Sequence, residues 1–88
     1  MNELYEHRIK RLKMRSMRRG IKEMDLILER FANRHIGQMD EAGLRCYDAL
    51  LSENDHDLYQ WVTGQVAAPE PYADLIGAIV EDLPKTST

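Results

Sequence analysis

Residues 71–83, PYADLIGAIVEDL, carry the clearest amphipathic pattern of the sequence. Pro71 suits the first turn of a helix, where its missing N–H costs nothing, and Pro84 is placed to end that helix. The apolar side chains recur at the spacing of one helix face: Tyr72, Leu75, Ile76, Ile79, Val80 and Leu83. The pattern therefore predicts an amphipathic helix whose apolar face must be covered by the rest of the chain.

Four further segments upstream show the same helical spacing. They run from about Asn2 to Met17, from Ile21 to about Arg34, from the N-cap Asp40 to near Ser52, and from the N-cap Asn54 to Gly64. Gly20 separates the first two segments, because glycine is unfavourable inside a helix. Sustained alternation and Asn-Gly or Asp-Gly hairpin signals are absent from the sequence. The sequence thus predicts an all-α fold, a compact bundle of five short helices in residues 1–84, followed by a disordered C-terminal tail at residues 85–88.

Two of the predicted helices begin at residues that suit a helix start. Asp40 and Asn54 can each accept a hydrogen bond from the first free backbone N–H groups. Asp55 and Asp57 follow Asn54 in the first turn, where the helix dipole favours negative charge. Gly43 lies inside the helix that Asp40 starts, where a better helix former is usual, so the stability of that helix is in question.

The length and the cysteine content exclude several classes of protein. At 88 residues the chain has room for one small domain, and not for a two-domain enzyme or a nucleotide-binding sheet with its helices. No apolar run approaches the roughly 18 residues of a membrane span. Cys46, the single cysteine, allows neither an intramolecular disulfide nor a Cys-based zinc site. His7, His35 and His56 lie in separate segments without the spacing of metal ligands. We therefore expect a cofactor-free binding module with no metal site and no catalytic residues.

The charge is divided unevenly along the chain. Residues 1–34 hold ten Lys and Arg against five Asp and Glu, whereas residues 35–88 hold two against ten. Within the first segment Arg8, Arg11, Arg15 and Arg18 follow the helical period and form a basic stripe. Such a stripe suits an acidic partner or a polyanion, although it can equally be a solvated helix face.

The motif at residues 18–25, RRGIKEMD, lies at the joint between the first two predicted helices. It has a structural interpretation: with Gly20 as N-cap, Glu23 falls at the position from which a carboxylate reaches back to the cap N–H. It also has a functional interpretation. Gly20 lets the backbone of a partner approach closely, while Arg19 and Glu23 offer directional contacts of opposite charge.

Two blocks of the sequence resemble the succinate dehydrogenase assembly factor 2 family, whose bacterial members are called SdhE. The first block is Arg11-Leu12, Ser16, Arg19-Gly20-x-x-Glu23-x-Asp25-Leu26-Ile27-Leu28 and Phe31. The second is Leu50-Leu51 followed by Asp55-x-Asp57-Leu58-x-x-Trp61. The resemblance extends over roughly residues 5–83, with the blocks in the same order and spacing as in the family.

The resemblance implies a chaperone-like assembly factor that binds the flavoprotein subunit of succinate dehydrogenase, and often that of fumarate reductase. Such a factor promotes covalent attachment of FAD to a histidine of that subunit. FAD is then the cofactor of the partner, and this chain binds no cofactor tightly. The functional patch of the family is its RGxxE surface, which carries over to Arg19, Gly20 and Glu23, and with an extension to Ile21 and Asp25. We expect a monomer that has neither a nucleic acid nor a membrane among its partners.

The sequence leaves two other functions open and suggests a cellular location. The basic N-terminal helix could belong to a small nucleic-acid-binding module, although the formal net charge of the chain is −3. The chain could also be an antitoxin-like regulator with a different protein partner. Because the family core begins within a few residues of Met1, we expect no targeting segment and therefore a bacterial cytoplasm.

Overall fold

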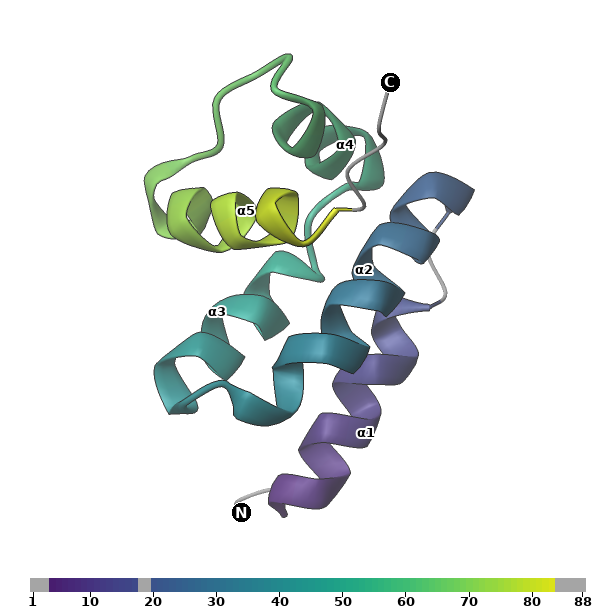
Figure 1. Cartoon of the computed structure of the whole chain (residues 1–88), viewed down its shortest axis with the longest axis vertical. Helices are drawn as coiled ribbons and strands as arrows, with labels where there is room; N and C mark the ends of the chain where they lie inside the picture. The colour runs from purple at the N-terminus through teal and green to yellow at the C-terminus, as the bar shows by residue number, and fades with distance from the viewer. Residues whose placement is uncertain (1–3, 18–19, 84–88) are drawn as a thin grey trace.

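The computed structural model describes residues 4–17 and 20–83, and these residues form five α-helices and one short 3-10 helix, without a strand (Figure 1). The elements are α1 (Tyr5–Ser16), α2 (Lys22–His35), η1 (Ile36–Gln38), α3 (Glu41–Leu50), α4 (Asp55–Thr63) and α5 (Glu70–Asp82). The predicted all-α, five-helix fold is confirmed. Pro84 and the predicted tail at 85–88 lie outside the described residues, as do Asn2 and the pair Arg18 and Arg19.

The predicted caps form at the expected residues. The side chain of Asp40 accepts a hydrogen bond from the Gly43 N–H at 2.8 Å, and that of Asn54 accepts one from the His56 N–H at 2.7 Å. Gly64 ends α4 with φ = 82°, a left-handed backbone that favours glycine. These local signals fix where α3 and α4 begin and where α4 ends.

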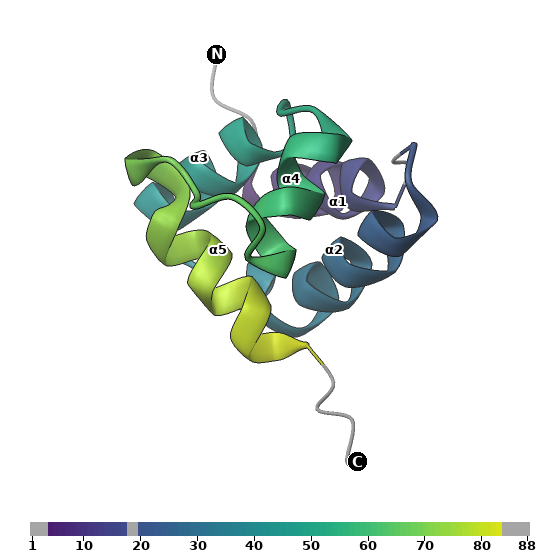
Figure 2. The ribbon, with the colours of Figure 1, turned by 90° about the horizontal axis from the view of Figure 1, so that it is seen from above.

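The helices are arranged as an antiparallel pair capped by a second layer. In Figure 1, α1 and α2 run side by side in opposite directions, and α4 and α5 lie across the upper end of the molecule. The view from above in Figure 2 places α4 between α5 and α2, and α4 packs against both. The N-terminus of α4 is thereby brought close to the joint between α1 and α2.

The core contains most of the apolar side chains that the sequence predicts, together with one polar pair, but Val80 of the predicted α5 face is 40% exposed. The buried apolar side chains come from every α-helix: Leu12, Met24, Leu28, Phe31, Ala32, Ile36, Leu44, Tyr47, Leu50, Leu51, Leu58, Val62, Leu75, Ile76 and Ile79. The Tyr47 hydroxyl meets the Ser16 hydroxyl at 2.5 Å, and Ser16 donates to the Leu12 carbonyl at 2.8 Å. Because buried hydroxyls need partners, this pair ties α1 to α3 at a defined register.

Candidate functional site

The candidate site lies at the joint between α1 and α2, where the RGxxE motif interrupts the helical pair. Gly20 is exposed, and Ile21 is the N-cap of α2 with extended backbone (φ −107°, ψ 123°). Ile21 is also half-buried against the core, which anchors the end of the joint. Arg19, the first predicted contact residue, lies outside the described residues.

A carboxylate from α4 holds the backbone of this joint. The N–H of Gly20 donates to Asp55 Oδ2 at 2.5 Å, and the N–H of Ile21 donates to the same oxygen at 3.1 Å. The two sequence blocks of the resemblance therefore meet in space, although 35 residues separate Gly20 from Asp55. From its position in the sequence, Asp55 is expected only to interact favourably with the dipole of its own helix. Local spacing does not reveal a contact with a distant segment.

The position of Asp55 also explains the glycine of the motif. A Cβ atom on residue 20 would lie 3.2 Å from Asp55 Oδ2, closer than an ordinary van der Waals contact. Gly20 therefore accommodates a carboxylate of its own chain. From the sequence alone, Gly20 was interpreted as leaving space for the backbone of a partner, and the carboxylate of Asp55 was not considered.

Glu23 lies in the first turn of α2 and is exposed. The predicted capping arrangement with Gly20 as N-cap is wrong, because the N-cap is Ile21 and α2 has no side-chain cap. The Gly20 N–H, which Glu23 would have to reach in that arrangement, is bonded to Asp55. Glu23 makes no hydrogen bond or ion pair with any described residue, so its carboxylate is available to a partner.

Two further residues complete the surface around Glu23. Asp25 is half-buried in the same turn of α2. Leu26 is 58% exposed and lies three residues after Glu23, the spacing that makes two side chains neighbours on a helix surface. Leu26 could have been found from the sequence, because it lies off the apolar face that Met24 and Leu28 define.

The basic stripe on α1 faces another helix of the same chain. Arg8 pairs with Glu41 at 2.8 Å, Arg11 pairs with Asp48 at 3.0 Å, and Arg15 also pairs with Asp48. Arg18, the fourth member, lies outside the described residues. The hydrogen bond from Arg11, together with the charges of Arg11 and Arg15, lowers the pKa of Asp48 below its ordinary value. The stripe is therefore largely neutralised by acidic residues of α3, which the sequence could not show.

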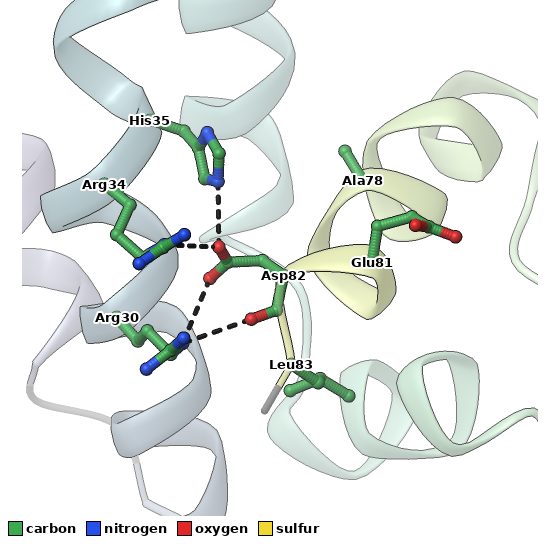
Figure 3. A pocket seen from close by; sticks show the side chains of 7 residues that line it. All are labelled: Arg30, Arg34, His35, Ala78, Glu81, Asp82 and Leu83. Atoms are coloured by element: carbon green, nitrogen blue, oxygen red, sulfur yellow. Dashed lines mark hydrogen bonds and ion pairs between the residues drawn. The ribbon is translucent and has the colours of Figure 1, made fainter. Parts of the chain in front are cut away.

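A hollow of about 580 Å³ lies between α2 and α5 (Figure 3). Its centre is the carboxylate of Asp82, which is only 4% exposed. Arg34 Nε and His35 Nε2 contact Asp82 Oδ1 at 2.7 Å and 2.9 Å, and Arg30 Nε donates to the Asp82 carbonyl at 3.1 Å. These contacts clamp the end of α2 to the end of α5, so the polar groups of the hollow serve the fold.

Metal-ligating and nucleophilic groups are dispersed over the described part of the chain. Within residues 4–17 and 20–83 no group of three or more His, Cys, Asp or Glu could hold a metal ion. His35 belongs to the Asp82 clamp, while His7 and His56 are exposed. Cys46 donates its S–H to the Pro71 carbonyl at 3.2 Å, and burial together with Asp74 raises the pKa of the thiol. A raised pKa favours the unreactive protonated form. No described helix is long and apolar enough to span a membrane.

The fold and the site define a small helical protein whose exposed, polar motif sits on a joint between helices. Comparison with known proteins assigns that class to a family. The chain belongs to the Sdh5 family, described as "Flavinator of succinate dehydrogenase", whose profile matches residues 10–83. The resemblance drawn from the sequence is thereby confirmed.

Fungal relatives are similar over most of this chain. A protein of Schizosaccharomyces pombe is 43% identical over 75 residues, covering 82% of this chain and 54% of the relative. A protein of Candida glabrata is 46% identical over 63 residues, covering 72% of this chain and 41% of the relative. Both are named "Succinate dehydrogenase assembly factor 2, mitochondrial". The chain spans about half the length of the relatives that it matches.

These names correct the expected location. The bacterial cytoplasm was inferred from the position at which the family core begins, and that inference is wrong, because the relatives are named mitochondrial. The start of a chain that spans about half of its relatives carries no information about a targeting segment.

Proposed function

We propose that this chain is an assembly factor that binds the flavoprotein subunit of succinate dehydrogenase and promotes covalent attachment of FAD to it. The proposal rests on Glu23, whose carboxylate is exposed and has no partner among the described residues. Glu23 lies next to a joint whose backbone is held by Asp55. Membership of the flavinator family and the names of the fungal relatives support the same function.

The chemistry belongs to the partner. The bond that forms joins a flavin carbon to a histidine of the flavoprotein subunit, so FAD is the cofactor of that subunit and this chain holds no cofactor tightly. Correct positioning of reacting groups can lower a barrier by up to about 7–11 kcal/mol, without a nucleophile or a base from the factor. The factor is therefore an accessory protein and not an enzyme.

The contact surface consists of Arg19, Gly20, Ile21, Glu23 and Asp25. Glu23 supplies a charge-assisted contact to a cationic group of the partner. The exposed Leu26 beside it adds apolar area, and a mixed surface of this kind suits a modest interface that releases the matured subunit. The flavoprotein subunit of fumarate reductase is a second client of the same surface.

The nucleic-acid alternative has little to support it. Such a module needs free cations along one face to neutralise phosphates. Arg8, Arg11 and Arg15 are instead paired with carboxylates of α3, so the described part of the stripe is not a free cationic face. The same pairing makes the stripe a poor device for steering an acidic partner.

The test is the amount of covalent flavin on a co-expressed flavoprotein subunit, read as fluorescence in a denaturing gel. The wild-type chain should raise covalent flavin strongly, and Glu23→Ala should abolish the increase. Glu70→Ala is a matched control, because Glu70 is also an exposed glutamate in the first turn of a helix, α5, at a distance from the motif. Covalent flavin that is the same with and without the wild-type chain would reject the proposed function.

A further inference from the structure

We propose that Asp55 is a positioning residue for the candidate site: its carboxylate fixes the backbone of Gly20 and Ile21 and thereby sets the orientation of the motif toward the partner. This inference rests on the proposed function, but its structural half can be measured on the isolated protein.

The first argument is the geometry of the contact. A single oxygen, Asp55 Oδ2, accepts hydrogen bonds from two consecutive backbone N–H groups, at 2.5 Å and 3.1 Å. Bonds to an ionised acceptor are shorter and stronger than neutral ones. Because Gly20 and Ile21 immediately precede α2, the carboxylate determines the path by which the chain enters the helix that carries Glu23.

The second argument is that α4 does not need this carboxylate for its own cap. Asn54 caps α4 by accepting a hydrogen bond from the His56 N–H, so the start of the helix already has a side-chain cap. Asp55 is the first residue of α4, and its Oδ2 is directed to the joint that precedes α2. Removal of the carboxylate therefore releases the joint while the cap and the apolar core remain.

The third argument is the coupling between the two residues. A side chain at position 20 would place its Cβ 3.2 Å from Asp55 Oδ2, so the carboxylate would have to shift by a few tenths of an ångström and its bonds to the two N–H groups would weaken. If Gly20 acts by admitting Asp55, substitutions at the two positions remove the same interaction and their effects do not add. If Gly20 acts only by admitting a partner, the two effects are independent and do add.

The experiment uses four single variants, one of them a control, and one double variant of the full chain. Asp55→Ala removes the acceptor, Asp55→Asn keeps a neutral acceptor, and Gly20→Ala crowds the same oxygen. Asp57→Ala is the control for stability and for the amide spectrum, because Asp57 is an exposed acid in the same first turn that makes no hydrogen bond or ion pair with any described residue. The double variant Gly20→Ala with Asp55→Ala tests the coupling.

The structural readout is the amide spectrum of the isolated protein. Amide protons that donate to a carboxylate resonate downfield, so the Gly20 and Ile21 signals should move upfield in Asp55→Ala and stay in place in Asp57→Ala. Asp55→Ala should melt at a lower temperature than Asp57→Ala, because both variants lose one first-turn charge but only Asp55→Ala also loses the two hydrogen bonds to the joint. Unmoved amide signals in Asp55→Ala would overturn the inference, whatever the flavin assay shows.

The functional readout is covalent flavin on the co-expressed flavoprotein subunit. Asp55→Ala should lower the rate of attachment about tenfold, the factor expected when hydrogen bonds to a charged group are lost. Asp55→Asn should recover to within about threefold of wild type, because a neutral acceptor is weaker but competent. The double variant should be no slower than the slower single variant. Attachment at the wild-type rate in Asp55→Ala would reject the positioning role and leave the proposed function intact, whereas inactivity of the wild-type chain would reject the proposed function itself.

Discussion

The hydroxyl groups of Ser16 and Tyr47 meet at 2.5 Å inside the bundle, and both residues are fully buried. Ser16 is in the last turn of α1, and Tyr47 is in the middle of α3. Tyr47 also approaches the Leu28 carbonyl of α2 at 3.4 Å. The hydroxyl of Tyr47 thus connects α3 with both α1 and α2. It fixes the end of α1, directly before the RGxxE joint.

Tyr47→Phe tests the energetic weight of this contact. The variant keeps the ring and removes the hydroxyl, so Ser16 loses one of its two buried partners, and we expect unfolding to become easier by about 1–3 kcal/mol. Urea unfolding measures the loss. The double variant with Ser16→Ala should cost less than the sum of the two single variants, because no unsatisfied hydroxyl then remains at position 16. Additive losses would show that the two hydroxyls do not act as a pair.

Two helical glycines should respond differently to alanine. Gly77 lies within α5, is exposed, and has open space where a Cβ would be, so Gly77→Ala should stabilise the protein by about 0.5–1 kcal/mol. At Gly43 the added Cβ would lie 3.2 Å from Asp40 Oδ1 and 3.3 Å from Met39 Cε. Asp40 Oδ1 accepts the hydrogen bond that caps α3 and cannot withdraw without weakening it, so Gly43→Ala should gain less than Gly77→Ala. Equal gains in thermal unfolding would show that the cap adjusts freely.

Stability should decrease in acid because two carboxylates are held ionised. Burial opposes the ionisation of Asp82, but the hydrogen bonds and charges of His35 and Arg34 outweigh it and lower the pKa. Arg11, and then Arg15, lower the pKa of Asp48. A folded-state pKa below the unfolded value gives stability that is present above about pH 4 and is lost as the pH falls through the folded pKa.

The measurement is the urea midpoint as a function of pH. The urea midpoint of the wild type should decrease as the pH is lowered below about 4. In Asp82→Asn and in Asp48→Asn this decrease should be smaller. At neutral pH both variants should be less stable than wild type, with a smaller loss for Asp48→Asn because that side chain is 31% exposed. An acid limb unchanged in Asp82→Asn would show that Asp82 does not drive the acid response.

The elements could be predicted from the sequence because their signals are local. The caps Asp40 and Asn54 and the stop at Gly64 depend on residues a few positions apart and are found as expected. The apolar face of α5 is also found, except that Val80 is 40% exposed. The resemblance to a family was also carried by spacing within two blocks, and the family match confirms it. Signals of this kind can be recognised without knowing which helices are in contact.

Long-range pairing could not be predicted in the same way. The amphipathic pattern of α1 gave its basic stripe but not the carboxylates of α3 that neutralise it. The capping interpretation of Glu23 followed from spacing alone, and it failed because Asp55 of α4 already accepts from the Gly20 N–H that Glu23 would need. Asp55 was missed for the same reason, since a contact across 35 residues leaves no periodic trace.

Glu23→Ala separates a contact residue from a stability residue. Because Glu23 makes no hydrogen bond or ion pair with a described residue and is exposed, its removal should cost only its interaction with the α2 dipole, about 0.3–1 kcal/mol at most. Binding to the flavoprotein subunit should weaken far more, and titration calorimetry with the isolated subunit measures that loss. Glu70→Ala should show the same small change in stability with unchanged binding, since it removes an equivalent first-turn charge on α5. If Glu23→Ala instead binds like wild type and loses about 2 kcal/mol of stability, the size of a lost cap, then Glu23 serves the helix and the contact surface must be sought elsewhere.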